Sequence, residues 1–255
     1  MKQGYGKKAI FRFYEELNDF LPVGERKRDR IYSFRGNPSV KDAIEAQNIP
    51  HTEVDLILVN GRPVSFDHKL KNSDRVSVYP VFESFDISGV KQDSGPVRDS
   101  RFILDVHLGK LAKYLRMAGF DTFYRNDLKD DEIIKRSVEE NRIILTRDKG
   151  ILKNSLVQKG YYIRSQNPWE QLKETILRFQ LQSSIQFLSR CMECNGIIAE
   201  VKKKEIEKFL KPGTSRNFDK FFRCTNCGRI YWEGSHFTRM KQYYKDLKTF
   251  LDDAG

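Results

Sequence analysis

The sequence predicts a chain of three modules that combines α+β and α/β architecture. Residues 1–86 read as a few strands around one helix, which is typical of a small α+β module. Residues 101–185 alternate helical and strand periods, which favours a parallel sheet. Residues 186–255 contain two Cys-x-x-Cys pairs, which indicate a bound metal. The stretch at 87–100 has no apolar period and is rich in Ser, Gly and Asp, so we expect a linker there.

The first module begins with two predicted strands, at residues 9–14 and 30–35. A helix start follows Pro38. Ser39 can cap the backbone amide three residues later, and the carboxylate of Asp42 suits the positive end of the helix. The sequence therefore predicts a helix that begins directly after Ser39.

A hairpin and a closing strand complete this module. Two apolar runs, at 56–59 and 62–66, flank Asn60-Gly61, a pair that accepts the positive φ angles of a type I′ turn. Residues 75–82 alternate as a last strand. The pattern resembles the ubiquitin-like β-grasp fold in its sulfur-carrier-like branch.

Sulfur carriers of that branch end in a free Gly-Gly, whereas this chain continues as Pro-Val-Phe-Glu at 80–83. The resemblance therefore implies the fold and disfavours carrier chemistry. We expect a structural or docking module, through which a protein partner could bind. A sulfur-carrier partner that acts through this module is the weaker alternative.

The second module opens with an apolar strand at 102–104, followed by an amphipathic helix that ends at Gly119. Further strands are predicted at 121–124, 143–146 and 161–163, and a second helix begins at Asp130. A helix that starts at Pro168 follows. The inward residues predicted for these last two helices are Ile133, Ile134, Val138, Trp169, Leu172, Ile176 and Phe179. This order predicts a parallel sheet with helices on both faces.

Aspartates follow the predicted strands at the edge where such sheets bind ligands. Asp105 and Asp148 come directly after apolar strands, and Asp130, with Asp131 beside it, begins a helix. Converging carboxylates repel one another unless a hard divalent cation lies between them. Two such cations about 4 Å apart can activate water and stabilise the leaving oxygen in phosphodiester hydrolysis. Each aspartate alone also suits a helix N-cap, and that alternative stays open.

Two segments carry a more specific resemblance. FILDVHLGKLAKYLRMAGFDT and DDEIIKRSVEENRIILTRDKGIL resemble the PIN-like nuclease domain of the Mut-seven C-terminal RNase family. The resemblance implies a PIN-like α/β/α sandwich and metal-dependent RNA cleavage with Mg²⁺ or Mn²⁺. The catalytic, metal-holding carboxylates that it implies are those of Asp105, Asp148 and Asp130, or Asp131 if the register is shifted by one.

PIN-like nucleases often use a fourth acidic residue, and its position here is open. Asp121 and Asp127 are both candidates, and a third possibility is that no residue fills the role. The number of metal ions is therefore undetermined by the sequence. Because the acidic set is incomplete, an alternative function stays open. The chain could be a non-catalytic RNA-binding or adaptor protein on a PIN-like scaffold.

The third module is defined by Cys191, Cys194, Cys224 and Cys227, which form two Cys-x-x-Cys knuckles. Four thiolates at this spacing suit tetrahedral Zn²⁺. The alternatives are two disulfides or a redox pair. Four cysteine ligands close the coordination shell, so we expect a structural zinc that is needed for folding. A glycine follows each second cysteine and allows the tight turn of a knuckle.

This end of the chain also matches the zinc ribbon of the same family, and it mixes aromatic with basic residues. The rings could stack on single-stranded RNA or could form the core of the ribbon. Met240, Tyr244, Leu247 and Leu251 have helical spacing and predict a closing helix. The candidate RNA-binding residues of the whole chain are Lys110, Lys113, Arg116, Arg147, Arg223, Arg229 and Arg239. Lys110, Lys113 and Arg116 could instead be the solvated face of their helix.

Charge and composition restrict the functional class. The 255 residues carry a net charge of +11, which favours a polyanionic partner. Residues 1–95 contribute +1, while residues 96–187 and 188–255 contribute +5 each. We find no secretory leader and no apolar run of about 18 residues, and four cysteines are too few for a disulfide scaffold. We therefore expect a cytoplasmic, metal-dependent ribonuclease that needs no membrane.

Overall fold

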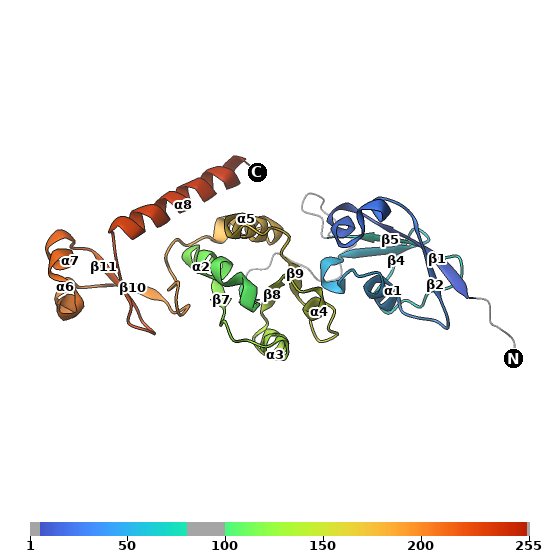
Figure 1. Cartoon of the computed structure of the whole chain (residues 1–255), viewed down its shortest axis with the longest axis horizontal. Helices are drawn as coiled ribbons and strands as arrows, with labels where there is room; N and C mark the ends of the chain where they lie inside the picture. The colour runs from blue at the N-terminus through green and yellow to red at the C-terminus, as the bar shows by residue number, and fades with distance from the viewer. Residues whose placement is uncertain (1–5, 81–99, 254–255) are drawn as a thin grey trace. The chain divides into compact units, whose positions relative to one another are not determined.

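The computed structural model describes residues 6–80 and 100–253 and contains three separate sheets (Figure 1). The predicted linker at 87–100 lies outside the described residues except for Ser100. The chain divides into two compact units. The first comprises Met1–Gly95, Ile134–Glu140 and Thr146–Tyr162. The second comprises Pro96–Ile133, Asn141–Leu145 and Ile163–Gly255.

The N-terminal sheet is a ubiquitin-like β-grasp sheet in the order β2-β1-β5-β3-β4. Strand β1 pairs with β5 in parallel, and the other three strand pairs of this sheet are antiparallel. The elements are β1 (Lys7–Phe13), β2 (Arg30–Phe34), α1 (Val40–Ala46), β3 (Leu56–Val59), β4 (Arg62–Pro63) and β5 (Arg75–Tyr79), with 3₁₀ turns at Glu15–Phe20, Val23–Glu25 and His51–Glu53. The core consists of fully buried apolar side chains such as Phe11, Phe13, Ile44 and Val78. The predicted strands and helix are confirmed.

Local chemistry explains the start of α1 and the β3–β4 turn. The Ser39 hydroxyl accepts a hydrogen bond from the Asp42 amide, and the Asp42 carboxylate accepts one from the Ser39 amide, both at 3.1 Å. The hydrogen bond to Ser39 lowers the pKa of Asp42. Asn60 (φ 52°) and Gly61 (φ 79°) both adopt positive φ, as a type I′ turn requires. Strand β4 ends at Pro63, three residues before the predicted end.

The first unit also contains α4 (Lys149–Leu152) and β9 (Gly160–Tyr162), which pack against the β-grasp domain. The ring of Phe20 meets that of Tyr162 at 5.3 Å between centroids. The Tyr162 amide donates a 2.6 Å hydrogen bond to the carboxylate of Glu53, a side chain only 1% exposed. Within the first unit, these contacts join the segment of α4 and β9 to the β-grasp sheet.

His51 makes a further contact between these segments. Its Nδ1 lies 2.6 Å from Oε1 of Glu45, and its Nε2 lies 2.8 Å from the carbonyl oxygen of Val157. The residue is 8% exposed. We expect His51→Ala to lower the free energy of unfolding by about 1–3 kcal/mol, because it leaves a buried acceptor without a donor. Denaturant unfolding measures this effect.

Lys153→Ala is the matched control for His51→Ala. It removes an exposed contact between the same segments, the 2.8 Å hydrogen bond from Lys153 Nζ to Asn48 Oδ1. We expect a change within about 0.5 kcal/mol. Equal losses of stability in the two variants would contradict the assignment of a buried contact to His51.

The middle sheet has the order β7-β6-β8-β9, and β6 runs parallel to both β7 and β8. The elements are β6 (Arg101–Leu104), a 3₁₀ turn (Val106–Leu108), α2 (Gly109–Met117), β7 (Asp121–Phe123), α3 (Asp130–Glu140), β8 (Ile143–Thr146) and α5 (Pro168–Arg178). Phe102, Ile103 and Leu104 are fully buried. This parallel-sheet α/β domain confirms the prediction.

One predicted core position in α3 is wrong. Val138 is 50% exposed, while the neighbouring Ser137 is 5% exposed. The buried face of α3 runs through Ile133, Ile134 and Ser137, and Ser137 lies four and three residues after the two isoleucines, as positions on one helix face do. Val138 lies at the edge of that face and is turned toward solvent.

The C-terminal sheet has three strands in the order β10-β11-β12. The elements are a 3₁₀ turn (Gln182–Ser184), β10 (Ile198–Val201), α6 (Lys203–Ile206), a 3₁₀ turn (Glu207–Phe209), α7 (Pro212–Asn217), β11 (Phe221–Cys224), β12 (Ile230–Trp232) and α8 (Ser235–Asp253). In α8, Leu247 and Leu251 are buried, which confirms the predicted closing helix. No helix within the described residues has the length and apolar character needed to cross a bilayer.

Candidate functional site

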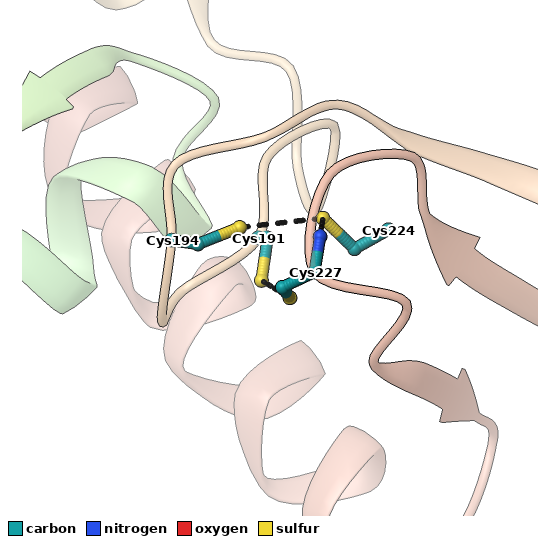
Figure 2. A group of neighbouring side chains, drawn as sticks. All are labelled: Cys191, Cys194, Cys224 and Cys227. Atoms are coloured by element: carbon teal, nitrogen blue, oxygen red, sulfur yellow. Dashed lines mark hydrogen bonds between the residues drawn. The ribbon is translucent and has the colours of Figure 1, made fainter.

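The four predicted cysteines come together at the end of the ribbon sheet (Figure 2). Their sulfur atoms all lie within 4.8 Å of one another. The Cys191–Cys227 sulfurs are 3.7 Å apart and the Cys194–Cys224 sulfurs 3.4 Å apart. A tetrahedral Zn²⁺ with Zn–S bonds of about 2.3 Å needs sulfurs about 3.8 Å apart. All four cysteines are free thiols, so the cluster fits a metal ion.

Backbone geometry shapes the two knuckles. Backbone amides of Asn226 and Cys227 point to the sulfur of Cys224 at 3.4 and 3.5 Å. Gly228 has φ +73°, as predicted for a tight turn. Gly196 has a different role: a Cβ there would lie 2.9 Å from the Cys224 sulfur, so glycine allows close packing around the cluster.

The electrostatics of the cluster favour a thiolate at Cys194 but not at Cys227, where the Arg229 amide is outweighed by burial and the neighbouring thiols, which raise the pKa of Cys227 to about 12. Burial opposes ionisation of Cys194, but the Gly196 amide and the neighbouring thiols outweigh it and lower the pKa of Cys194 to about 6. The Tyr231 hydroxyl lies 3.1 Å from the Cys191 sulfur. Burial, together with this contact, raises the pKa of Tyr231, so Tyr231 keeps its proton and can donate it toward the sulfur. Such an outer hydrogen bond orients a metal ligand.

Arg116 anchors the first knuckle to the α/β domain. Its Nη1 donates to the carbonyl oxygens of Met192 (3.0 Å) and Glu193 (2.8 Å), and its Nε donates to that of Thr122 (3.0 Å). Arg116 is 4% exposed. We therefore replace the predicted RNA-binding role of Arg116 by a structural one, because its guanidinium is buried against backbone carbonyls and is closed to a phosphate.

Asp121 forms a second anchor between the same parts. Its carboxylate accepts hydrogen bonds from Arg142 (2.7 Å) and Asn195 (2.8 Å) and pairs with Arg190 at 3.5 Å. Asn195 in turn accepts from the Thr122 amide at 3.0 Å. Burial opposes ionisation, yet the hydrogen bonds from Arg142 and Asn195 lower the pKa of Asp121. Asp121 is thus committed to a structural ion pair, which disfavours it as a fourth metal ligand.

The lowered pKa of Asp121 predicts an acid-sensitive junction. A carboxyl with a lower pKa when folded adds stability above its unfolded pKa of about 3.9, and this contribution is lost as the pH falls through the folded value. We expect wild type to lose more stability than Asp121→Asn between about pH 5 and pH 2. Thermal unfolding of both proteins across that range measures it, and parallel pH curves would refute the role given to Asp121.

The four predicted catalytic aspartates stand at the starts of helices or turns. Asp105 follows β6, is 3% exposed and accepts a 2.7 Å hydrogen bond from the His107 amide. Asp148 is exposed, follows β8 by two residues and caps α4 through a 2.6 Å hydrogen bond from the Gly150 amide. Asp130 and Asp131 are both exposed in the first turn of α3.

The predicted N-cap role is therefore present for Asp105 and Asp148. Within residues 6–80 and 100–253, the four cysteines are the only group of three or more His, Cys, Asp or Glu side chains placed so that they could hold one metal ion. The predicted aspartates do not form such a group. Asp127, the other fourth-acid candidate, is exposed and forms an ion pair of 2.7 Å with Arg125.

Comparison with known proteins decides the family. Residues 100–244, more than half of the chain, match the family model described as the Mut7-C RNAse domain. The chain belongs to the Mut7-C RNAse family. Residues 6–86 match the model described as Mut7-C ubiquitin, so both predicted resemblances are confirmed. No curated protein and no solved structure matches the chain significantly.

The remaining basic candidates of this Mut7-C protein differ in accessibility. Lys110 and Lys113 are exposed on α2, and both line a cavity of about 420 Å³. Arg147 is half-buried, while Arg229 and Arg239 are exposed. Arg223 is half-buried, lies over the ring of Phe209 at 5.5 Å and donates to the carbonyl of Gly228.

The aromatic residues of the Mut7-C ribbon divide between the two roles left open by the sequence. Phe221 is fully buried, and the Tyr231 hydroxyl faces Cys191, so these two rings belong to the core. Trp232 is 37% exposed and is accessible to a ligand. Sequence reasoning missed the structural roles of Arg116 and Asp121, because no local sequence pattern indicates their distant partners.

Proposed function

We propose that this protein is a metal-dependent ribonuclease that hydrolyses RNA phosphodiester bonds through Asp105, Asp130 and Asp148. The observation that carries the proposal is the position of Asp105, a buried carboxylate directly after the central strand β6 in a Mut7-C RNAse domain. Ligands of parallel sheets bind at this strand end. Strand β8, in register with β6 through Leu104 and Leu145, leads toward Asp148.

The residues present suit a hard divalent cation, because carboxylate oxygens are the ligands that Mg²⁺ and Mn²⁺ prefer. Asp105, Asp130 and Asp148 would hold it. The capping hydrogen bonds of Asp105 and Asp148 each involve one carboxylate oxygen, and a carboxylate has about four acceptor sites. A bound divalent cation supplies an activated water and neutralises charge on the phosphate.

Basic residues of the same domain and the zinc ribbon support binding. The exposed Lys110 and Lys113 lie one helix turn apart on α2 and can attract the phosphate backbone. We assign a structural Zn²⁺ to Cys191, Cys194, Cys224 and Cys227, where it holds the ribbon against the α/β domain. Free thiols of this kind suit the reducing cytoplasm, where we expect the protein to act on RNA.

The test is a panel of structured and single-stranded RNAs, incubated with the full chain with and without Mn²⁺. We expect cleavage of at least one RNA that requires Mn²⁺ or Mg²⁺ and disappears without it. RNA binding without metal-dependent cleavage of any RNA would instead favour the adaptor function, which the capping roles of Asp105 and Asp148 also permit.

A further inference from the structure

We propose that the cavity between α2, the loop after β7 and the first cysteine knuckle binds one nucleotide of single-stranded RNA. Its phosphate would meet Lys110 and Lys113, and its base would meet Tyr124. The inference rests on the proposed ribonuclease function and names a substrate subsite that includes the metal-binding knuckle. It places the predicted contacts of Lys110 and Lys113 in one defined cavity and adds Tyr124, which no sequence pattern indicates.

The cavity has the size and lining of a nucleotide site. Its volume of about 420 Å³ lies within the range of about 300–1,000 Å³ that is usual for small-ligand sites. All of its lining residues belong to the second unit: Gly109, Lys110, Lys113, Arg116, Tyr124, Arg125, Asn126, Met192 and Glu193. Four of these carry positive charge and one carries negative charge, so the cavity favours an anion, although the guanidinium of Arg116 is held by backbone carbonyls and makes no direct contact with it.

The cations at the cavity are available to different degrees. Lys110 is exposed and has no ion-pair or hydrogen-bond partner in the described part of the chain, so it is the first candidate for a phosphate. Lys113 pairs with Glu193 at 3.4 Å, with both side chains about half exposed. Arg125 is held by Asp127 and Glu132. A phosphate therefore gains most from Lys110 and competes with Glu193 for Lys113.

The remaining lining suits a base. Tyr124 is half-buried, and its hydroxyl donates a 3.0 Å hydrogen bond to the carbonyl of Val106. A Cβ at Gly109 would lie 2.6 Å from that hydroxyl oxygen, so the glycine lets the ring lie against the start of α2. A ring fixed in this way is a stacking platform for any base. The Asn126 amide offers both a donor and an acceptor to a base edge.

The metal-binding knuckle forms one wall of the cavity. Met192 and Glu193 lie between the ligands Cys191 and Cys194, and Arg116 holds both of their carbonyls. Their position therefore depends on the folded knuckle. This links the cysteine cluster to RNA binding through the cavity wall, independently of the exposed rings of the ribbon.

The test measures binding of a fluorescent oligouridylate to the full, zinc-loaded chain without Mg²⁺ or Mn²⁺, over a series of salt concentrations. Lys110→Ala should weaken binding and reduce the salt slope by about 0.7, the contribution of one phosphate contact to a single strand. Glu193→Gln should strengthen binding, because it frees Lys113. Tyr124→Leu should weaken binding by about fivefold or more with an unchanged salt slope.

Lys204→Ala is the matched control, since it removes one exposed lysine charge from α6, outside the cavity. Equal weakening by Lys110→Ala and Lys204→Ala, or no gain in affinity from Glu193→Gln, would overturn the proposal. Lys110 and Glu193 are both exposed, so these variants should fold even if Tyr124→Leu does not. Because no cleavage is measured, failure of this subsite is distinguishable from failure of the ribonuclease function.

Discussion

Asp105→Asn is expected to reduce metal-dependent RNA cleavage by at least about 100-fold. Loss of a residue that only hydrogen-bonds to a metal ligand lowers activity by about 10- to 100-fold, and Asp105 is proposed as a ligand itself. The amide keeps the oxygen that accepts from the His107 amide, and asparagine caps helices as well as aspartate does. The variant should therefore fold and bind RNA almost as wild type does. Initial cleavage rates at saturating Mn²⁺, together with thermal unfolding, measure both parts of this prediction.

Asp42→Asn is the matched control, because Asp42 is also an aspartate in the first turn of a helix and accepts a backbone hydrogen bond. It lies in the β-grasp domain and should keep full activity. Asp130→Asn and Asp131→Asn decide which of these neighbours acts, and we expect the larger loss for Asp130. Full Mn²⁺-dependent activity of Asp105→Asn would remove Asp105 from the site.

Removing the metal from the cysteine cluster is expected to unfold the ribbon. Structural zinc contributes about 10–16 kcal/mol of apparent binding energy in small zinc domains at neutral pH. Apart from the cysteines, only two apolar side chains described between the start of β10 and the end of β12 are fully buried, those of Ile206 and Phe221. The ribbon therefore has a very small apolar core of its own. We expect about one zinc per chain by metal analysis. Hydrogen exchange should show protection of β10, β11 and β12 lost on chelation.

The β-grasp domain supplies the internal control for this experiment. Its core is formed by side chains such as Phe11, Phe13 and Val78, and it contains none of the four cysteines, so exchange of β1 and β5 should be unchanged by chelation. Cys224→Ser should reproduce the effect of chelation. A folded ribbon in protein that holds much less than one zinc would contradict the structural role.

Local features of the fold could be predicted because each depends on neighbouring residues. The capping pair Ser39 and Asp42 and the turn Asn60-Gly61 lie within a few residues of each other, and both have the predicted geometry. The prediction that Val138 is buried was wrong because periodicity defines the buried face of a helix only approximately. In the folded chain Ser137 is buried in its place.

A candidate site could be predicted where its residues lie close together in the sequence. The cysteines form two Cys-x-x-Cys pairs, and this spacing predicted their cluster. Arg116 was misassigned because its partners Met192 and Glu193 lie more than 70 positions away, and only the folded chain brings them together. The contact between His51 and Val157 spans 106 positions and has no local pattern at all.

The most direct test of the central claim is to map the proposed cation itself. Fe²⁺ accepts oxygen ligands similar to those of Mn²⁺, and with ascorbate and peroxide it cleaves the polypeptide beside the site that it occupies. We predict cuts next to Asp105, Asp130 and Asp148 together, which excess Mn²⁺ suppresses and Asp105→Asn abolishes. Cuts beside only one of the three, or cuts that persist in Asp105→Asn, would contradict a shared metal site.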